Sequence, residues 1–285
     1  MMPVDSRAGD RLEFSAGLSL AQTLEAHLEA VFVRPDPDET FIYLGLAPLS
    51  RDVAMQEMRA RMDARGKTDA DRFRRSFGAS CRKAGIPKAR RPERVRAATA
   101  SWRTLKGEPN EVIPAVARSA DLSLFTASRA RYSPLFENLL EVTLLRSGRP
   151  VLFVPAGCEI LPLRRALIAW DSSSGCARAV SAWLDLAGES ATASILHVEE
   201  QIGGDAPDMS EVLTHLGWHA VAAETETVAR GSESIGGILL QAAESADADL
   251  VVMGGYGRAR YREALLGGVT KHVIRQARVP VLMAH

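Results

Sequence analysis

Residues 248–285 read ADLVVMGGYGRARYREALLGGVTKHVIRQARVPVLMAH, and this stretch decides the fold. Residues 250–253 form a short apolar run, rich in β-branched side chains and followed at once by glycines, which predicts a buried parallel strand. Gly267 and Gly268 open a helical pattern, and residues 279–283 predict a last strand. Glycines let main-chain N–H groups approach an anion, and the first turn of a helix offers further unpaired N–H groups. We therefore expect a phosphate-binding loop here.

The same pattern occurs earlier in the chain, which predicts an internal repeat. The parallels are residues 119–125 with 247–253, 129–132 with 258–261, 150–154 with 280–283, and 4–6 with 170–172. Proline and glycine punctuate the chain at 155–157, so we place the domain border there. The prediction is one domain at 1–157 and a second at 158–285.

The second copy alternates apolar strand patterns with helical patterns throughout, which indicates a parallel sheet covered on both faces. The fold class that we expect is α/β, with two tandem open parallel-sheet domains of Rossmann-like type and helices on both faces. In such sheets, ligands bind beyond the carboxyl ends of the strands. Asp171, Val198 and Gly254 each follow or end a predicted strand, so we expect them to cluster.

The first copy departs from this pattern. Its first strand has only residues 1–4, and residues 125–129 contain no glycine. Glu137 and Glu141 stand where small residues would meet a phosphate, so this copy is expected to be ligand-free. An insertion at about 36–100 predicts one long helix, residues 49–84. Its apolar positions, which we expect to pack on the domain, are Val53, Met55, Met58 and Met62.

Charge is balanced overall but not along the chain. The formal net charge is zero, so no global field favours nucleic acid or anionic lipid. Residues 51–96 hold fifteen Lys or Arg against six Asp or Glu. This surplus indicates a solvated helix face or, alternatively, a basic surface for an acidic partner or nucleic acid. No aromatic interleaving supports a nucleic-acid surface.

Apolar runs, the N-terminal pattern and the cysteines predict the cellular compartment. No apolar run is long enough for a membrane span, and the first residues lack the pattern of a signal peptide. The three cysteines, Cys81, Cys158 and Cys176, are scattered and odd in number, which favours reduced thiols. We expect a cytoplasmic protein with no membrane partner.

The spacing Gly254, two residues, Gly257, nine residues, Gly267 and a small residue resembles the nucleotide-binding signature of the universal stress protein family. Gly268 departs from the family's Ser or Thr, and Thr270 keeps a hydroxyl two residues later. The resemblance implies a tandem member with an adenine nucleotide, such as ATP with or without Mg²⁺, in the second domain. It also implies pairing of the last strands, 151–154 with 281–285, as an internal pseudo-dimer, with a homodimer as a further expectation.

The resemblance also assigns roles within the expected site. Asp171 would contact the ribose or adenine, or else only cap a helix, and Trp170 would pack or stack on a base. The Val198 main chain would read the adenine edge. The glycines would hold phosphate or, alternatively, only make a tight turn, and Arg258 and Arg260 could add charged contacts. The predicted site comprises Ala169, Trp170, Asp171, Val198, Met253, Gly254, Gly257, Arg258, Gly267, Gly268, Val269 and Thr270.

The sequence gives little support to an enzymatic function. The sequence has no GxxxxGK[ST] loop and no GxSxG elbow. His215 and His219 lie one helical turn apart, but no acidic third ligand is near, so no metal site is expected. The hypothesis is therefore an ATP-binding stress-response module with at most weak ATP hydrolysis. The alternative is a ligand-free interaction or scaffold protein of the same fold.

Overall fold

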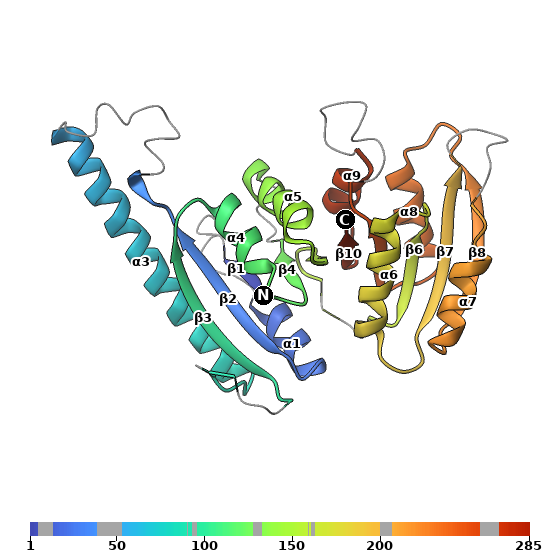
Figure 1. The fold of residues 1–285 in the computed structure, drawn as a ribbon, viewed down its shortest axis with the longest axis horizontal. Helices are drawn as coiled ribbons and strands as arrows, with labels where there is room; N and C mark the ends of the chain where they lie inside the picture. The colour runs from blue at the N-terminus through green and yellow to red at the C-terminus, as the bar shows by residue number, and fades with distance from the viewer. Residues whose placement is uncertain are drawn as a thin grey trace. The chain divides into compact units, whose positions relative to one another are not determined.

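The computed structural model describes residues 1–4, 14–38, 53–89, 91–92, 96–127, 133–158, 160, 163–199, 207–256 and 268–285 (Figure 1). The chain divides into two compact units. Unit 1 comprises residues 1–124 and 133–147, and unit 2 comprises residues 125–132 and 148–285. The units are defined by packing, whereas the borders 1–157 and 158–285 describe the sequence repeat and stay a prediction.

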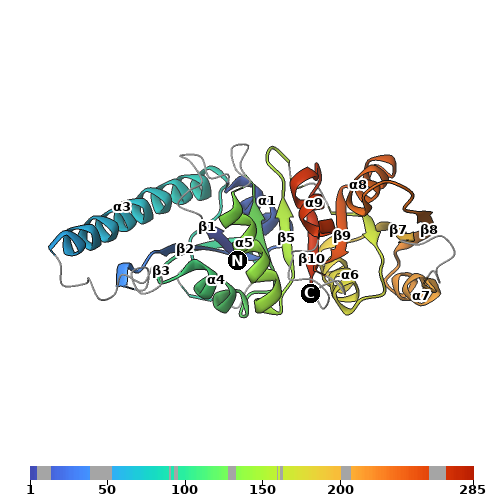
Figure 2. The same cartoon turned by 90° about the horizontal axis from the view of Figure 1, so that it is seen from above.

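Unit 2 alternates strands and helices, as the sequence predicts. Its elements from residue 165 onward are β6 (Arg165–Ala169), α6 (Ser174–Ala187), β7 (Thr192–Glu199), α7 (Ser210–Trp218), β8 (Ala222–Ala229), α8 (Ile235–Ser245), β9 (Leu250–Gly254), α9 (Gly268–Gln276) and β10 (Val281–Ala284). The sheet has the order β4-β5-β10-β9-β6-β7-β8, and the pairs from β10 to β8 are parallel. Helices α6 and α7 cover one face, and α8 and α9 cover the other (Figure 2). The α/β class is confirmed.

The burial of the strands explains their sequences. Every residue of β10 is buried, as are residues 250–253 of β9, because helices cover both faces of these central strands. β8 is the edge strand, and its sequence AAETETVA is largely exposed. Charged residues on an edge strand discourage pairing with other chains.

β5 (Val151–Val154) pairs antiparallel with β10, in the register Val281 with Phe153 and Met283 with Val151. The two strands that were expected to pair therefore do so. The pairing of two whole domains, and of two chains, stays a prediction.

Unit 1 contains a second sheet of order β1-β2-β3, all parallel. Its elements are β1 (Met2–Val4), α1 (Ser15–Thr23), β2 (His27–Arg34), α3 (Val53–Lys83), β3 (Thr99–Lys106), α4 (Pro109–Ala117) and α5 (Pro134–Ser147), and β4 (Ser123–Thr126) follows α4. The short β1 is anchored on both sides. It pairs with β2, and the Met1 carbonyl accepts a hydrogen bond of 2.8 Å from the Leu124 N–H.

The long helix of the insertion is present, but its predicted packing face is wrong in part. Val53 and Met58 are 70% and 49% exposed, and Met55 and Met62 are only half-buried. The first four residues of the predicted helix, 49–52, lie outside the described residues. The buried positions of α3 are instead Gly66, Ala70, Phe73, Phe77, Gly78 and Cys81. Large aromatic side chains in its second half bury more area than the methionines do, and they decide where the helix packs.

Aromatic contacts join α3 to the sheet of unit 1. The Phe77 ring lies 5.0 Å from Phe14 and 5.8 Å from Trp102, measured between centroids, and Phe73 lies 5.6 Å from Phe32. The first half of α3 makes polar contacts instead, such as the ion pair of Arg59 with Asp38. The insertion is therefore part of the core of unit 1 through its second half.

Candidate functional site

The strand order of unit 2 changes direction at β6. The chain passes from β6 to β7 on one side, whereas β9 lies on the other side. Ala169, at the carboxyl end of β6, stands opposite Leu196 of β7 and Met253 of β9. Such a switch point opens a ligand crevice beyond the carboxyl ends of the strands. The structure therefore brings the ends of β6, β7 and β9 to one edge, as the sequence predicted.

The turn after β6 carries Asp171. Its Oδ1 accepts a hydrogen bond of 2.9 Å from the Ser173 N–H, and the Ser173 Oγ accepts one of 3.1 Å from the Cys176 N–H. Ser173 is thus the N-cap of α6, while Asp171 shapes the turn that precedes it. The Asp171 side chain is exposed. Its carboxylate stands at the carboxyl edge of the sheet, where a ligand could reach it.

Two glycines allow α6 to pack closely against the ends of β9 and β10. A Cβ at Gly254 would lie 3.0 Å from both the Cys176 N and the Ser173 Oγ, and a Cβ at Gly175 would lie 2.9 Å from the Ala284 carbonyl oxygen. Gly254 therefore has a packing role whether or not a ligand binds. Cys176 belongs to the same contact, since its Sγ donates to the Ala169 carbonyl at 3.1 Å. Burial, and after it the nearby Asp171 charge, raises the pKa of the Cys176 thiol to about 12, so it stays protonated.

Adding a methyl group at either glycine should destabilise the protein. We expect Gly254→Ala and Gly175→Ala each to lower the free energy of unfolding by about 1–3 kcal/mol, because backbone atoms must shift to admit the Cβ. Gly217 of α7 is the matched control, since a Cβ there meets no atom within 4 Å. Gly217→Ala should raise the free energy of unfolding by about 0.5–1 kcal/mol through helix propensity. Denaturant unfolding checks all three, and equal effects would refute the packing role.

Trp170 is a predicted site residue, but no sequence pattern shows how its indole N–H is placed. Its backbone is fixed, because the Trp170 N–H donates to the Leu196 carbonyl at 2.9 Å and the His197 Nδ1 contacts the Trp170 carbonyl at 2.9 Å. This contact gives the His197 ring a structural role. The Trp170 Nε1 is buried, yet it has no hydrogen-bond partner among the described residues. An unsatisfied buried donor costs about 1–3 kcal/mol, so this position of the indole lowers the stability of the fold.

The main chain of Val198 faces the same region. In a parallel strand the N–H and C=O of every second residue point to the same neighbour. Thr192 donates to the Arg164 carbonyl and Leu196 accepts from the Trp170 N–H, so this set of β7 residues points toward β6. Val198 is the next in that set and lies beyond the last paired residue of β6. Its polar main-chain groups therefore face the carboxyl edge, as a residue that reads a base edge requires.

The glycine loop after β9 is described only in part. The Gly255 N–H donates to the Ala284 carbonyl at 2.8 Å, and the Tyr256 N–H donates to the Thr270 Oγ1 at 3.3 Å. Thr270 is only 3% exposed, so its hydroxyl serves the loop rather than an open site. Met253 is likewise buried. The predicted site residues Gly257, Arg258 and Gly267, as well as Arg260, lie outside the described residues.

The start of α9 is more open. Gly268 is exposed, Val269 is half-buried, and a Cβ at Gly268 would meet no atom within 4 Å. The amide groups of Gly268, Val269 and Thr270 belong to the first described turn of α9. Donors in the first turn of a helix suit an anion. Any phosphate contact from the described part of α9 would therefore come from its main chain.

Metal and membrane features are scarce in the part of the chain that the structure describes. No group of three ligating side chains occurs there. His215 and His219 are exposed at the end of α7, with ring centroids 4.9 Å apart. None of the described helices has both the length and the hydropathy needed to span a membrane.

Residues 162–285 match the Universal stress protein family. A universal stress protein from Archaeoglobus fulgidus superposes with a TM-score of 0.67 at 18% identity, over 99% of this chain and 95% of that chain. A functionally unknown protein from Pseudomonas aeruginosa superposes with a TM-score of 0.50 at 14% identity, over 99% of this chain and 90% of that chain. No curated protein matches the sequence significantly. The part of the chain that forms the switch-point site, residues 162–285, is a domain of the universal stress protein family.

Proposed function

We propose that the protein is a tandem universal stress protein whose unit 2 binds an adenine nucleotide, ATP, in a stress-response regulatory role. One observation carries this proposal: three groups suited to a nucleotide occur together in unit 2. They are the exposed Asp171 carboxylate, the main chain of Val198 at the carboxyl edge of the sheet, and the open start of α9. The full-length superposition on the Archaeoglobus fulgidus protein supports the tandem arrangement. Unit 1 then acts as the degenerate partner copy.

The chemistry of the edge suits the three parts of a nucleotide. An adenine edge needs a main-chain donor and acceptor, which Val198 offers. The Asp171 carboxylate can accept hydrogen bonds from ribose hydroxyls. The N–H groups in the first turn of α9 can donate hydrogen bonds to phosphate oxygens. A Mg²⁺ ion would be held mainly by phosphate oxygens and water, as this ion commonly is. The cysteine usage favours the cytoplasm as the place of action.

The proposed role is binding rather than strong catalysis. The Cys176 thiol is protonated and buried, and Asp171 already accepts the Ser173 N–H within its own turn. Neither group is prepared to activate a water molecule beside the start of α9. Slow hydrolysis at most is the expectation.

A scaffold role without a ligand is the second candidate. It is favoured by the packing roles of Gly254 and Thr270, which explain both residues without a nucleotide. The exposed Val53 and Met58 on α3 would then belong to its contact surface. Deleting the insertion would remove Phe73 and Phe77 from the core and so disturb the fold. The double variant Val53→Ser with Met58→Ser changes only the exposed surface, so it is the better variant for a pull-down test.

Gentle purification followed by mass spectrometry of the released small molecules tests the nucleotide proposal. We expect an adenine nucleotide to co-purify with the wild-type chain, in an amount that falls in Asp171→Ala. A chain that releases no nucleotide, and takes up none after incubation with ATP, would favour the scaffold role.

A further inference from the structure

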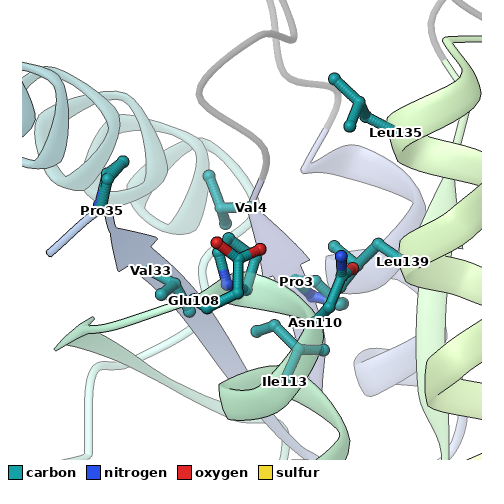
Figure 3. Close-up of a pocket in the computed structure, with 10 residues that line it drawn as sticks. Pro3, Val4, Val33, Pro35, Glu108, Asn110, Ile113, Leu135 and Leu139 are labelled. Atoms are coloured by element: carbon teal, nitrogen blue, oxygen red, sulfur yellow. The ribbon is translucent and has the colours of Figure 1, made fainter. Parts of the chain in front are cut away.

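Unit 1 contains a pocket of about 60 Å³ beyond the carboxyl ends of β1 and β2, at the start of α4 (Figure 3). In the sequence repeat, Val4 of this pocket is the counterpart of Trp170, so the pocket occupies the position that corresponds to the site of unit 2. Sequence reasoning predicted that this copy binds no ligand because it lacks the glycine loop. The pocket leaves room for a ligand of different chemistry.

The inner wall of the pocket is apolar. Val4, Val33 and Ile113 line it, and each is at most 7% exposed. Leu139 of α5 adds a further aliphatic side chain. Since a dry cavity of about 150 Å³ can hold the six carbons of benzene, a pocket of about 60 Å³ suits an alkyl group of two or three carbons.

The polar groups of the pocket come from the start of α4 and disfavour phosphate. Glu108 is the N-cap of α4 and Pro109 is its first residue, so the helix start carries a carboxylate and lacks one N–H donor. The Glu108 side chain makes no capping hydrogen bond. Figure 3 shows Glu108 and Asn110 beside Val4, Val33 and Ile113. An anionic ligand would meet this carboxylate, whereas a cationic one would be attracted to it.

The cations near the pocket are already paired with other carboxylates. Lys106 lies 2.7 Å from Asp36, Arg146 lies 2.7 Å from Glu111, and Arg34 pairs with Asp63. Among the described residues, no Lys or Arg forms an ion pair with Glu108, which is exposed at the mouth of the pocket. Among the described residues, the mouth therefore presents a carboxylate without an ion-paired cation above an apolar interior.

We propose that this pocket binds small alkylammonium compounds, in which an alkyl group of about two or three carbons joins a primary amine. The alkyl group would lie against Val33 and Ile113, and the ammonium would pair with the Glu108 carboxylate. This site is independent of the nucleotide site proposed for unit 2, and each can fail without the other.

Three probes with one carbon skeleton test the proposal on the full chain: propylamine, propan-1-ol and propanoate. Ligand-observed NMR titration measures their binding. We expect the amine to bind in the millimolar range, the alcohol about fivefold more weakly, and the carboxylate not measurably, because a partly exposed ion pair contributes up to about 1 kcal/mol.

Two variants and a matched control complete the test. Glu108→Gln should weaken amine binding about fivefold and leave alcohol binding unchanged. Asn110→Trp, which fills the mouth, should abolish binding of both. Glu111→Gln removes the same charge from the same helix outside the pocket, and it should leave amine binding unchanged. Thermal unfolding establishes that each variant is folded. Equal binding of amine and carboxylate, equal effects of the two Glu→Gln changes, or no binding of the amine would overturn the proposal.

Discussion

Replacing Gly268 by Asp is expected to lower the affinity of unit 2 for ATP about a hundredfold, because like charges brought together in a binding site cost several kcal/mol. Gly268 is the first described residue of α9, and a Cβ there meets no atom within 4 Å. The aspartate therefore fits without strain. A carboxylate in the first turn also interacts favourably with the helix dipole, by about 0.3–1 kcal/mol. The variant should thus be at least as stable as the wild type while its affinity falls.

Gly268→Ser is the matched control for this prediction. It adds a side chain of similar size without charge, and it restores the hydroxyl residue of the family signature. We expect its ATP affinity to equal or exceed that of the wild type. Calorimetric titration measures both affinities, and denaturant unfolding measures both stabilities. If Gly268→Asp bound ATP as tightly as Gly268→Ser, the assignment of phosphate to the start of α9 would be wrong.

Phe77→Ala should destabilise unit 1 by about 3–5 kcal/mol, the largest stability effect that we expect. The Phe77 side chain is fully buried, and its ring contacts Phe14 and Trp102. Truncation leaves a cavity between α3, α1 and β3 that these rigid elements can fill only in part. Met58→Ala, on the exposed half of the same helix, should change the free energy of unfolding by less than about 0.5 kcal/mol.

Chemical denaturation followed by tryptophan fluorescence distinguishes the two variants, since Trp102 contacts Phe77 directly. A small loss for Phe77→Ala would mean that the insertion does not share the core of unit 1. In that event a surface role for the whole of α3 would regain support.

The sheet of unit 2 was predictable because its signals are local. The apolar runs at 250–253 and 281–283, the glycines after them and the helical spacing between strands each depend on neighbouring residues alone. The edge at which the candidate site lies followed as well, because all parallel strands of one sheet end on the same side. This rule placed Asp171, Val198 and Gly254 at that edge without any knowledge of side-chain contacts.

The details that sequence reasoning missed depend on contacts between distant residues. No pattern reveals that the Thr270 hydroxyl accepts the Tyr256 N–H, or that the buried Trp170 Nε1 has no partner in the described part of the chain. The packing face of α3 was a different case. Ala70, Phe73, Phe77 and Cys81 have helical spacing and could have been chosen over the methionines. The larger area that these residues bury decides which face of α3 packs on the sheet. This area can be judged only once the sheet that they cover is known.

Isothermal titration calorimetry of the full chain with ATP tests the central claim most directly. A nucleotide site in unit 2 should give a saturable heat and a rise in melting temperature at millimolar ATP, since a ligand that binds only the folded state stabilises it. Both signals should disappear in Gly268→Asp. Absence of heat and of any melting-temperature shift for the wild-type chain at millimolar ATP would mean that unit 2 does not bind this nucleotide.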